Sequence, residues 1–187
     1  MARVPYCDPD TAPEGSREML AKLAKVNVFR ALANSPTMFP AFIRLGNAIL
    51  LKSKLDPILR EMAIVRVGIL SRAGYEVFQH DRISRQVGIS DEKIAALRVG
   101  ADAEVFTDIE RAVLRFTDDV VKNVRASDET YGAVARHLDP NQMIELVVTI
   151  GYYMMVSRFL ETMGVELEEP DQMETVRFGE KGFSRTP

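Results

Sequence analysis

Cysteine, tryptophan and histidine are scarce in this sequence, and this scarcity narrows the chemistry available to it. Tryptophan is absent, histidine occurs twice, and Cys7 is the single cysteine among 187 residues. One cysteine can form neither an internal disulfide nor a zinc or redox site built from paired cysteines. Cys7 lies in the stretch V-P-Y-C-D-P-D, which holds no group that would activate a thiol, so we interpret this cysteine as incidental.

An excess of positive charge and long apolar runs are also missing. The formal net charge is −3 and the isoelectric point is about 5.5, so no basic field is available to hold nucleic acid or an anionic membrane surface. Residues 1–16 contain no apolar segment typical of a signal peptide. The apolar uncharged run from Leu146 to Ser157 is too short to cross a hydrocarbon core of about 30 Å. These absences predict a cytoplasmic protein without nucleic-acid or membrane partners.

What the sequence does contain is helical periodicity almost throughout. Apolar residues recur at helical spacing, breakers such as N-S-P separate the segments, and no convincing period-2 alternation is present. The sequence therefore predicts one all-α domain over residues 1–187, with an extended C-terminal arm at about 166–187. Helices are expected at about 16–33, 38–51, 57–72, 75–87, 91–99, 107–123, 127–137 and 140–164.

The segment G-Y-E-V-F-Q-H places Glu76 and His80 on one side of a helix. At 100° per residue, these two side chains fall within about 60° of Ile83 and Val87. Because Ile83 and Val87 need burial, we expect Glu76 and His80 to face the core with them. Burial raises the pKa of a carboxylic acid and a nearby carboxylate raises the pKa of histidine, so the pair could move a proton near neutral pH. The alternative is a structural i,i+4 pair worth a few tenths of a kcal/mol.

Glu61 is a lone carboxylate in the helix predicted at 57–72, which is otherwise apolar nearly all round and should be central and buried. A helix dipole tolerates an anion in the first turns, which leaves a purely structural role open for Glu61. Two carboxylates and an imidazole on consecutive buried helices nevertheless make Glu61, Glu76 and His80 a candidate acid/base site.

These residues also carry a resemblance to a known family. The stretch L-D-P-I-L-R-E-M-A-I-V-R-V, a short gap, and G-Y-E-V-F-Q-H-D-R-I-S-R-Q-V-G-I-S-D-E-K-I-A-A-L resemble the carboxymuconolactone decarboxylase family, with the core match over about residues 40–100. That family shares an all-helical fold with alkylhydroperoxidase D. The resemblance implies an alkylhydroperoxidase D-like helical bundle that assembles as a homo-oligomer: a dimer, trimer or hexamer. The apolar stretch from Met143 to Met155 also favours assembly, because one small domain cannot bury it all.

The peroxidase branch of this superfamily has a Glu, then C-x-x-C, then a His. Aligned on Glu61 and His80, its two cysteines fall on Ala73 and Glu76, so both thiols are absent here. Peroxide reduction by disulfide exchange needs both of them. The resemblance therefore favours the decarboxylase-type branch, which implies a cofactor-free lyase of aromatic catabolism acting on a small unsaturated carboxylate or lactone.

The resemblance implies a catalytic role for each member of the candidate site. His80 would carry the proton, Glu76 would set the tautomer and charge of His80, and Glu61 would be a second acid/base or would hold a water.

The substrate would also need donors that bind it. Tyr75 would donate a hydrogen bond, and Arg82 or Arg85 would bind the carboxylate, although both lie off the face that carries Glu76 and His80. Arg158 or an arginine of a neighbouring subunit is an equal alternative.

Two other functions stay open from the sequence. One is an alkylhydroperoxidase-like antioxidant protein, against which the missing cysteines argue, and the other is a non-enzymatic helical oligomer that binds a small molecule. A buried, mutually facing cluster of Glu61, Glu76 and His80 that opens to a pocket would favour the enzyme, and an exposed His80 would favour the non-enzymatic protein. The cluster offers one nitrogen and two carboxylates to a metal ion, but the other histidine, His137, is expected to be exposed near a helix end, so no metal is predicted.

Overall fold

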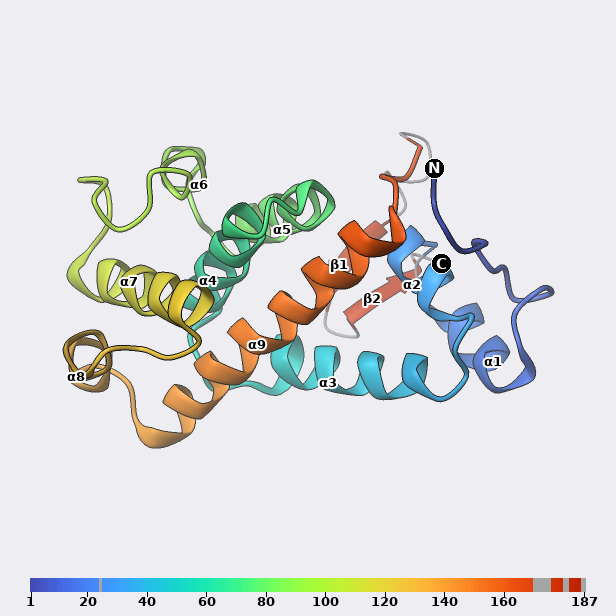
Figure 1. The fold of residues 1–187 in the computed structure, drawn as a ribbon, viewed down its shortest axis with the longest axis horizontal. Coiled ribbons are helices and arrows are strands. Elements are labelled where there is room, and N and C mark those ends of the chain that lie inside the picture. The colour runs from blue at the N-terminus through green and yellow to red at the C-terminus, as the bar shows by residue number, and fades with distance from the viewer. Residues whose placement is uncertain (24, 170–175, 180–181, 186–187) are drawn as a thin grey trace. The chain divides into compact units, whose positions relative to one another are not determined.

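The structure, a computed structural model, describes residues 1–23, 25–169, 176–179 and 182–185. Within these residues the chain forms nine α helices followed by a two-stranded hairpin (Figure 1). The all-α fold class predicted from the sequence is therefore confirmed, with the hairpin as an addition. The helices are α1 (Glu14–Lys22), α2 (Asn27–Leu32), α3 (Met38–Lys52), α4 (Pro57–Leu70), α5 (Gly74–Gln86), α6 (Asp91–Ala96), α7 (Asp108–Asn123), α8 (Asp128–Ala135) and α9 (Pro140–Met163).

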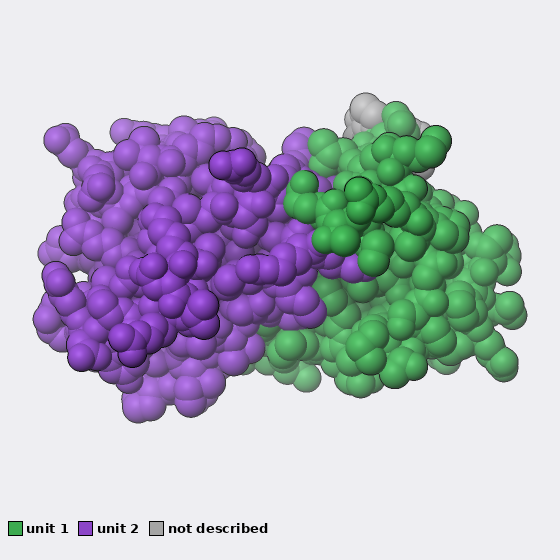
Figure 2. All heavy atoms as spheres, in the orientation of Figure 1, with its two compact units in different colours: residues 1–52, 160–187 green, residues 53–159 purple. Residues whose placement is uncertain are grey.

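The chain divides into two compact units, which Figure 2 shows in different colours. The first unit combines residues 1–52 with residues 160–187, and the second is the continuous segment 53–159. The second unit contains α4 to α8 and most of α9. The sequence predicts that the two units together make a single domain, and this stays a prediction.

In the first unit, the prediction of one continuous helix over residues 16–33 is wrong. Helix α1 ends at Lys22 and α2 begins only at Asn27. The backbone N–H of Asn27 donates to Oε1 of Glu168 at 2.6 Å, and its side-chain amide donates to the carbonyl of Glu166 at 3.0 Å. Glu168 thus supplies an acceptor at the start of α2, where backbone donors lack partners within the helix. Local periodicity cannot indicate such a distant partner. The backbone N–H of Arg3 similarly donates to the carbonyl of Met163 at 2.8 Å.

The C-terminal arm predicted at 166–187 contains an element that the sequence pattern did not indicate. Strands β1 (Val176–Gly179) and β2 (Gly182–Arg185) pair antiparallel, with Val176 opposite Arg185 and Gly179 opposite Gly182. The remainder of the arm after residue 169 lies outside the described residues.

In the second unit, α4 begins as the L-D-P motif predicts. The side chain of Asp56 accepts hydrogen bonds from the backbone N–H groups of Ile58 at 2.8 Å and Leu59 at 3.2 Å, and Pro57 occupies the first turn. Every residue from Leu59 to Gly68 is buried, so α4 is the central helix expected from its apolar sequence.

Helices α4 and α5 form the antiparallel pair that the sequence predicts. Arg72 adopts a positive φ of 56° in the turn between them, and α5 starts at Gly74. The two helices approach closely at Gly68, where an added Cβ would lie 3.0 Å from Cγ2 of Val77. This close antiparallel packing places the first half of α4 beside the middle of α5 and so determines where the candidate site forms.

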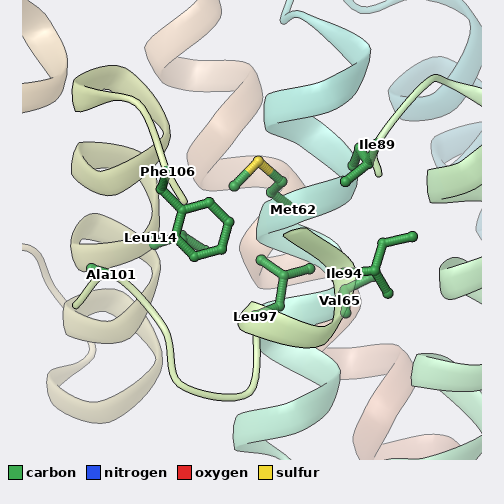
Figure 3. Packing of buried hydrophobic residues seen from close by; sticks show 8 residues of the cluster. All are labelled: Met62, Val65, Ile89, Ile94, Leu97, Ala101, Phe106 and Leu114. Carbon is green, nitrogen blue, oxygen red and sulfur yellow. The ribbon is translucent and has the colours of Figure 1, made fainter. Parts of the chain in front are cut away.

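The apolar core beside α4 holds this helix in place. Figure 3 shows Met62 and Val65 of α4 packed among residues from the segments that follow α5. The other residues of this apolar core are Ile89, Ile94, Leu97, Ala101, Phe106 and Leu114.

Arg66 connects α4 to α7 by a partly buried ion pair. Its Nε and second guanidinium nitrogen donate to the two carboxylate oxygens of Asp118 at 2.6 and 2.8 Å, a paired geometry that favours arginine. The guanidinium also packs against Gly100, whose φ of +93° and lack of a Cβ make room for it. The orientation of α4 is thus fixed by a charge pair as well as by apolar packing.

Helix α9 is the one helix in the described part of the chain that could cross a membrane by its length and composition. In the most apolar 18-residue segment of this helix, 50% is buried inside the structure. Core helices of soluble proteins satisfy the same criterion, so this is weak evidence for a membrane span. The cytoplasmic location stays a prediction.

Candidate active site

Glu61 lies in α4 with its side chain fully buried, at 0% exposure. The neighbouring Arg60 is also buried, and its Nε lies 3.5 Å from Oε1 of Glu61. A buried carboxylate is tolerated only when it is paired and hydrogen-bonded, because desolvation of an unpaired charge costs several kcal/mol. Arg60 therefore provides part of the counter-charge that allows Glu61 to stay inside the unit.

The imidazole of His80, on α5, lies between two carboxylates. Its Nδ1 is 2.7 Å from Oε2 of Glu61, and its Nε2 is 3.2 Å from Oε1 of Glu76. Glu76 and His80 are each only 3% exposed, and Ile83 on the same face of α5 is equally buried. The helical face expected from the sequence is confirmed. The shorter contact is with Glu61, so Glu61 rather than Glu76 fixes the orientation and tautomer of the imidazole.

Two tyrosines of α9 complete the surroundings of His80. The ring of Tyr153 meets the ring of His80 edge to face, with centroids 4.8 Å apart and an interplanar angle of 83°. Tyr152 contacts Tyr153 in the same manner at 5.2 Å. Burial raises the pKa of both phenols, and Glu76 raises it further, so both stay protonated near neutral pH.

The electrostatics of the cluster favour a shared proton. Burial raises the pKa of Glu76 to about 7, with a smaller opposing effect from His80 and a reinforcing one from Glu61. Burial by itself would lower the pKa of His80, but the charge and hydrogen bond of Glu61 and the charge of Glu76 outweigh burial and the opposing charge of Arg60. The net result is a pKa of His80 above its usual value. Glu76 can therefore gain or lose a proton close to neutral pH, and it lies beside an imidazole whose affinity for a proton is increased.

Replacing Glu76 with glutamine should change how stability depends on pH. A carboxyl whose pKa rises from 4.5 unfolded to about 7 folded stabilises the protein below pH 4.5, and this stabilisation is lost as the pH rises through 7. At about 1.4 kcal/mol per pKa unit, the wild type should lose roughly 3 kcal/mol over this range from Glu76 alone. Since glutamine does not ionise, Glu76→Gln should lack this part of the loss. Urea unfolding of the wild type and of the variant between pH 5 and 8.5 measures how the unfolding free energy of each depends on pH.

Glu92 of α6, which is exposed, offers the matched control. Glu92→Gln should follow the wild-type curve of unfolding free energy against pH. If Glu76→Gln followed that curve too, the raised pKa of Glu76 would be wrong.

The predicted substrate-binding residues do not gather at this cluster as a group. Arg85 lies on the surface, where its Nε donates to Oδ1 of Asp91 at 2.7 Å. Arg158 is exposed and donates to the carbonyl of Met154 in its own helix at 2.8 Å. Arg82 is half-buried on α5, and Tyr75 is buried at the start of the same helix.

Sequence reasoning missed two members of the cluster, Arg60 and Tyr153. Arg60 directly precedes Glu61, so its charge was a local signal that an adjacent buried carboxylate would have a partner. Tyr153 carries no such signal, because its contact with His80 depends on how α9 packs against α5.

No group of three or more His, Cys, Asp and Glu side chains in the described part of the chain is arranged to hold a metal ion. His137, the second histidine, is exposed after the end of α8. Both ring nitrogens of His80 already contact carboxylate oxygens. The arrangement suits proton transfer.

Comparison with known families identifies the domain that carries this cluster. Residues 36–119, which include Glu61, Glu76 and His80, match the carboxymuconolactone decarboxylase family. The resemblance expected from the L-D-P and G-Y-E-V-F-Q-H motifs is therefore confirmed. The match includes α3 of the first unit and α4 to α7 of the second. No curated protein matches the sequence.

Solved structures show that the fold is that of alkylhydroperoxidase AhpD-like proteins. An uncharacterized peroxidase-related protein from Ralstonia eutropha JMP134, described as an alkylhydroperoxidase AhpD core, is 21% identical, with a TM-score of 0.79 over 90% of this chain and 93% of that one. A peroxidase-related protein from Silicibacter sp. TM1040 is 18% identical, with a TM-score of 0.74 over 88% and 90% of the two chains.

The debrominase Bmp8 also has this fold. A cysteine-to-alanine variant of it, in complex with 2,3,4-tribromopyrrole, is 18% identical to this chain, with a TM-score of 0.70 over 86% of each chain. At these identities the similarity establishes the fold alone. Proteins of the carboxymuconolactone decarboxylase family and fold thus include enzymes of more than one kind.

Proposed function

We propose that this member of the carboxymuconolactone decarboxylase family is an acid/base enzyme that removes CO2 from a small unsaturated carboxylate or lactone acid without a cofactor. The observation that carries the proposal is the buried contact of His80 with both Glu61 and Glu76. A purely structural i,i+4 pair would not need a second carboxylate at the other ring nitrogen. The pKa of Glu76 near 7 and the raised pKa of His80 support the proton-transfer capacity that such a reaction needs.

In the proposed reaction, the bond between the carboxylate carbon and the adjacent carbon breaks. Its electron pair moves into the conjugated system to give a dienolate, and CO2 leaves. Protonated His80 then gives its proton to the dienolate carbon, and a proton from water, passed through Glu76, restores His80. The Nε2–Glu76 contact is longer than the Nδ1–Glu61 contact, so we assign Nε2 as the nitrogen that releases the proton. Glu61 remains paired with Arg60 and holds the ring.

The antioxidant alternative finds less support. The two positions that would hold the peroxidase cysteines are Ala73 and Glu76, and Cys7 belongs to the first unit, where its thiol is buried. Burial raises the pKa of Cys7, which leaves it a poor nucleophile. The bromopyrrole complex of Bmp8 indicates that a protein of this fold can take a small unsaturated ring, which is the size and kind of substrate proposed here.

The experiment that tests the proposal is a screen of purified protein against unsaturated lactone acids, with CO2 release and loss of ultraviolet absorbance as readouts. We expect at least one acid to lose CO2, and Cys7→Ser to turn it over as fast as the wild type. Peroxide reduction that depends on Cys7, without release of CO2 from any acid, would instead establish the antioxidant function.

We also propose that the chain forms a homo-oligomer, a dimer, trimer or hexamer, through apolar residues at the surface of α8 and α9. A shallow hollow there is lined by Tyr131, Met143, Ile144, Val147, Val148 and Pro140. Ile144 is 64% exposed and Val147 and Val148 are 45% and 41% exposed, although they are neighbours on one helix. Contiguous exposed apolar side chains typically mark an interaction surface, and a second copy brings an identical apolar surface to cover it.

Light scattering at micromolar concentration should report a multiple of 21.0 kDa for the wild type. Ile144→Asp should shift the mass toward the monomer, because it places a charge inside the contact. Val124→Asp changes a residue that is 89% exposed at the end of α7 and should leave the mass unchanged. A 21.0 kDa wild-type particle would contradict the proposal.

A further inference from the structure

Arg60 makes the surroundings of His80 electrically unequal on its two sides. Its guanidinium is buried beside Glu61, with Nε 3.5 Å from Oε1, and the other oxygen of that carboxylate lies 2.7 Å from Nδ1 of His80. Glu76 lies at Nε2 of the imidazole, and within the described part of the chain its one ion pair is with His80. A guanidinium is not deprotonated in proteins. The cluster therefore contains one cation whose charge is independent of pH, and that cation lies on the Glu61 side.

The net charge of the cluster determines how many protons it holds. When His80 is protonated and both glutamates are ionised, the three groups carry a formal charge of −1, which Arg60 balances. Neutrality matters because an uncompensated charge is strongly unfavourable in a buried place. The single proton of this neutral state belongs on the ring, because only a protonated imidazole donates at both nitrogens and each nitrogen contacts a carboxylate oxygen.

Without Arg60, the same three groups would need a second proton to be neutral. A positive charge disfavours protonation of every group near it, so its removal should increase the affinity of the cluster for protons. Glu76 is the group that would take the second proton, because burial raises its pKa to about 7 and Arg60 lies beside Glu61 instead. A protonated Glu76 can no longer accept a proton from water.

The other ionisable groups around the imidazole do not supply this balance. Tyr152 and Tyr153 of α9 stay uncharged near neutral pH, because burial raises the pKa of both phenols. Burial also raises the pKa of Asp81, the next residue of α5, and the charges of Arg98 and Arg85 partly oppose this effect. The buried guanidinium of α4 is thus the charge that balances the cluster.

We propose that Arg60 limits the cluster to one proton, so that slightly above neutral pH His80 is protonated while Glu76 is an ionised base. This assignment deepens the proposed function and rests on it for its role in catalysis, because that reaction needs both forms at once. Protonated His80 gives a proton to carbon, and ionised Glu76 accepts the next one from water. Arg60 acts through the two glutamates and does not touch the reacting atoms.

Nuclear magnetic resonance of the histidine side chains tests the proposal, because the chain contains only two histidines and the other one, His137, is exposed. Arg60→Met should raise the midpoint of the His80 titration by about one pH unit or more, since it removes a like charge from a buried site. The His80 signal reports the cluster as a whole, because groups in contact titrate together. His137 should titrate as in the wild type. With a substrate, the pH–rate profile should move in the same direction as the His80 midpoint.

Two further variants of Arg60 separate its charge from its packing. Arg60→Gln also removes the charge but keeps a donor for Glu61, and it should shift the His80 midpoint upward as Arg60→Met does. This second neutral variant keeps the test decisive if methionine prevents folding. Arg60→Lys keeps a positive charge and should restore most of the wild-type midpoint.

Arg111 of α7 supplies the matched control, because it is a half-buried arginine whose partners lie outside the cluster. Its guanidinium donates to the backbone carbonyls of Ala101, Ala103 and Phe106 at 2.7 to 3.1 Å. Arg111→Met should lower the melting temperature and leave the titration of His80 unchanged.

The outcomes separate this inference from the proposed function. If the neutral variants shift the His80 midpoint upward and the wild type releases CO2 from no acid, Arg60 does set the proton count and the decarboxylase proposal fails. If CO2 is released and Arg60→Met titrates at or below the wild-type midpoint, the assignment is wrong and the proposed function stands. An equal upward shift in Arg111→Met would also overturn the assignment, because the effect would then follow from disturbed packing rather than from charge.

Discussion

Replacing His80 with glutamine should abolish turnover of the decarboxylation substrate while the protein stays folded. Glutamine can still hydrogen-bond to Glu61, but its amide cannot carry a proton to carbon. A positioned acid/base group contributes roughly 10²- to 10⁴-fold to rate, so kcat should fall by about that factor. Release of CO2 measures kcat, and circular dichroism with the melting temperature measures the fold.

The other histidine provides the control for this variant. His137 is exposed and follows α8, so His137→Gln should turn over substrate at the wild-type rate. An unchanged rate in His80→Gln would remove His80 from the reaction. The pair of Glu76 and His80 would then be a structural contact between turns of α5.

Replacing Glu61 with alanine should cause the largest loss of stability of any single substitution in the cluster. The change leaves Arg60 and protonated His80 buried at 3% exposure without the carboxylate that lies between them. Removing one partner of a buried charge pair typically costs about 3–5 kcal/mol, because the remaining charge is uncompensated. Urea unfolding at pH 6 measures this loss, since His80, whose pKa is raised, is mostly charged there.

Glu110 allows the effect of burial to be separated from the loss of any ion pair. Glu110 pairs with Lys93 at 2.6 Å, but the side chain of Lys93 is 24% exposed, so water can solvate the charge that remains after Glu110→Ala. That variant should therefore lose less stability than Glu61→Ala. An equal or smaller loss in Glu61→Ala would mean that Arg60 and His80 are not held as a charged pair around Glu61.

The sequence predicted that Glu61, Glu76 and His80 come together better than it predicted which residues surround them. Helical periodicity was sufficient to turn Glu76 and His80 toward the core, because that choice depends only on where Ile83 and Val87 lie on the same helix. The pairing of Glu61 with His80 followed from two consecutive helices joined by a short turn. Both predictions depend on local geometry.

The missed features depend on segments that are distant in the sequence. Tyr153 reaches His80 only through the packing of α9, and the gap between α1 and α2 depends on a bond from Asn27 to Glu168. The side chain of Arg85 is long enough to reach several places, but the nearby Asp91 determines its direction. A sequence pattern shows that such side chains are present and gives no information about which partner they select.

The discontinuity of the first unit has a consequence for how the chain folds as the ribosome produces it. Residues 53–159 form a continuous unit, and we expect them to pack as soon as they have emerged, since domains generally fold as units. Residues 1–52 must wait, because Asn27 needs Glu168 and Arg3 needs Met163. We therefore expect the second unit to fold before the first, although the first unit begins earlier in the sequence.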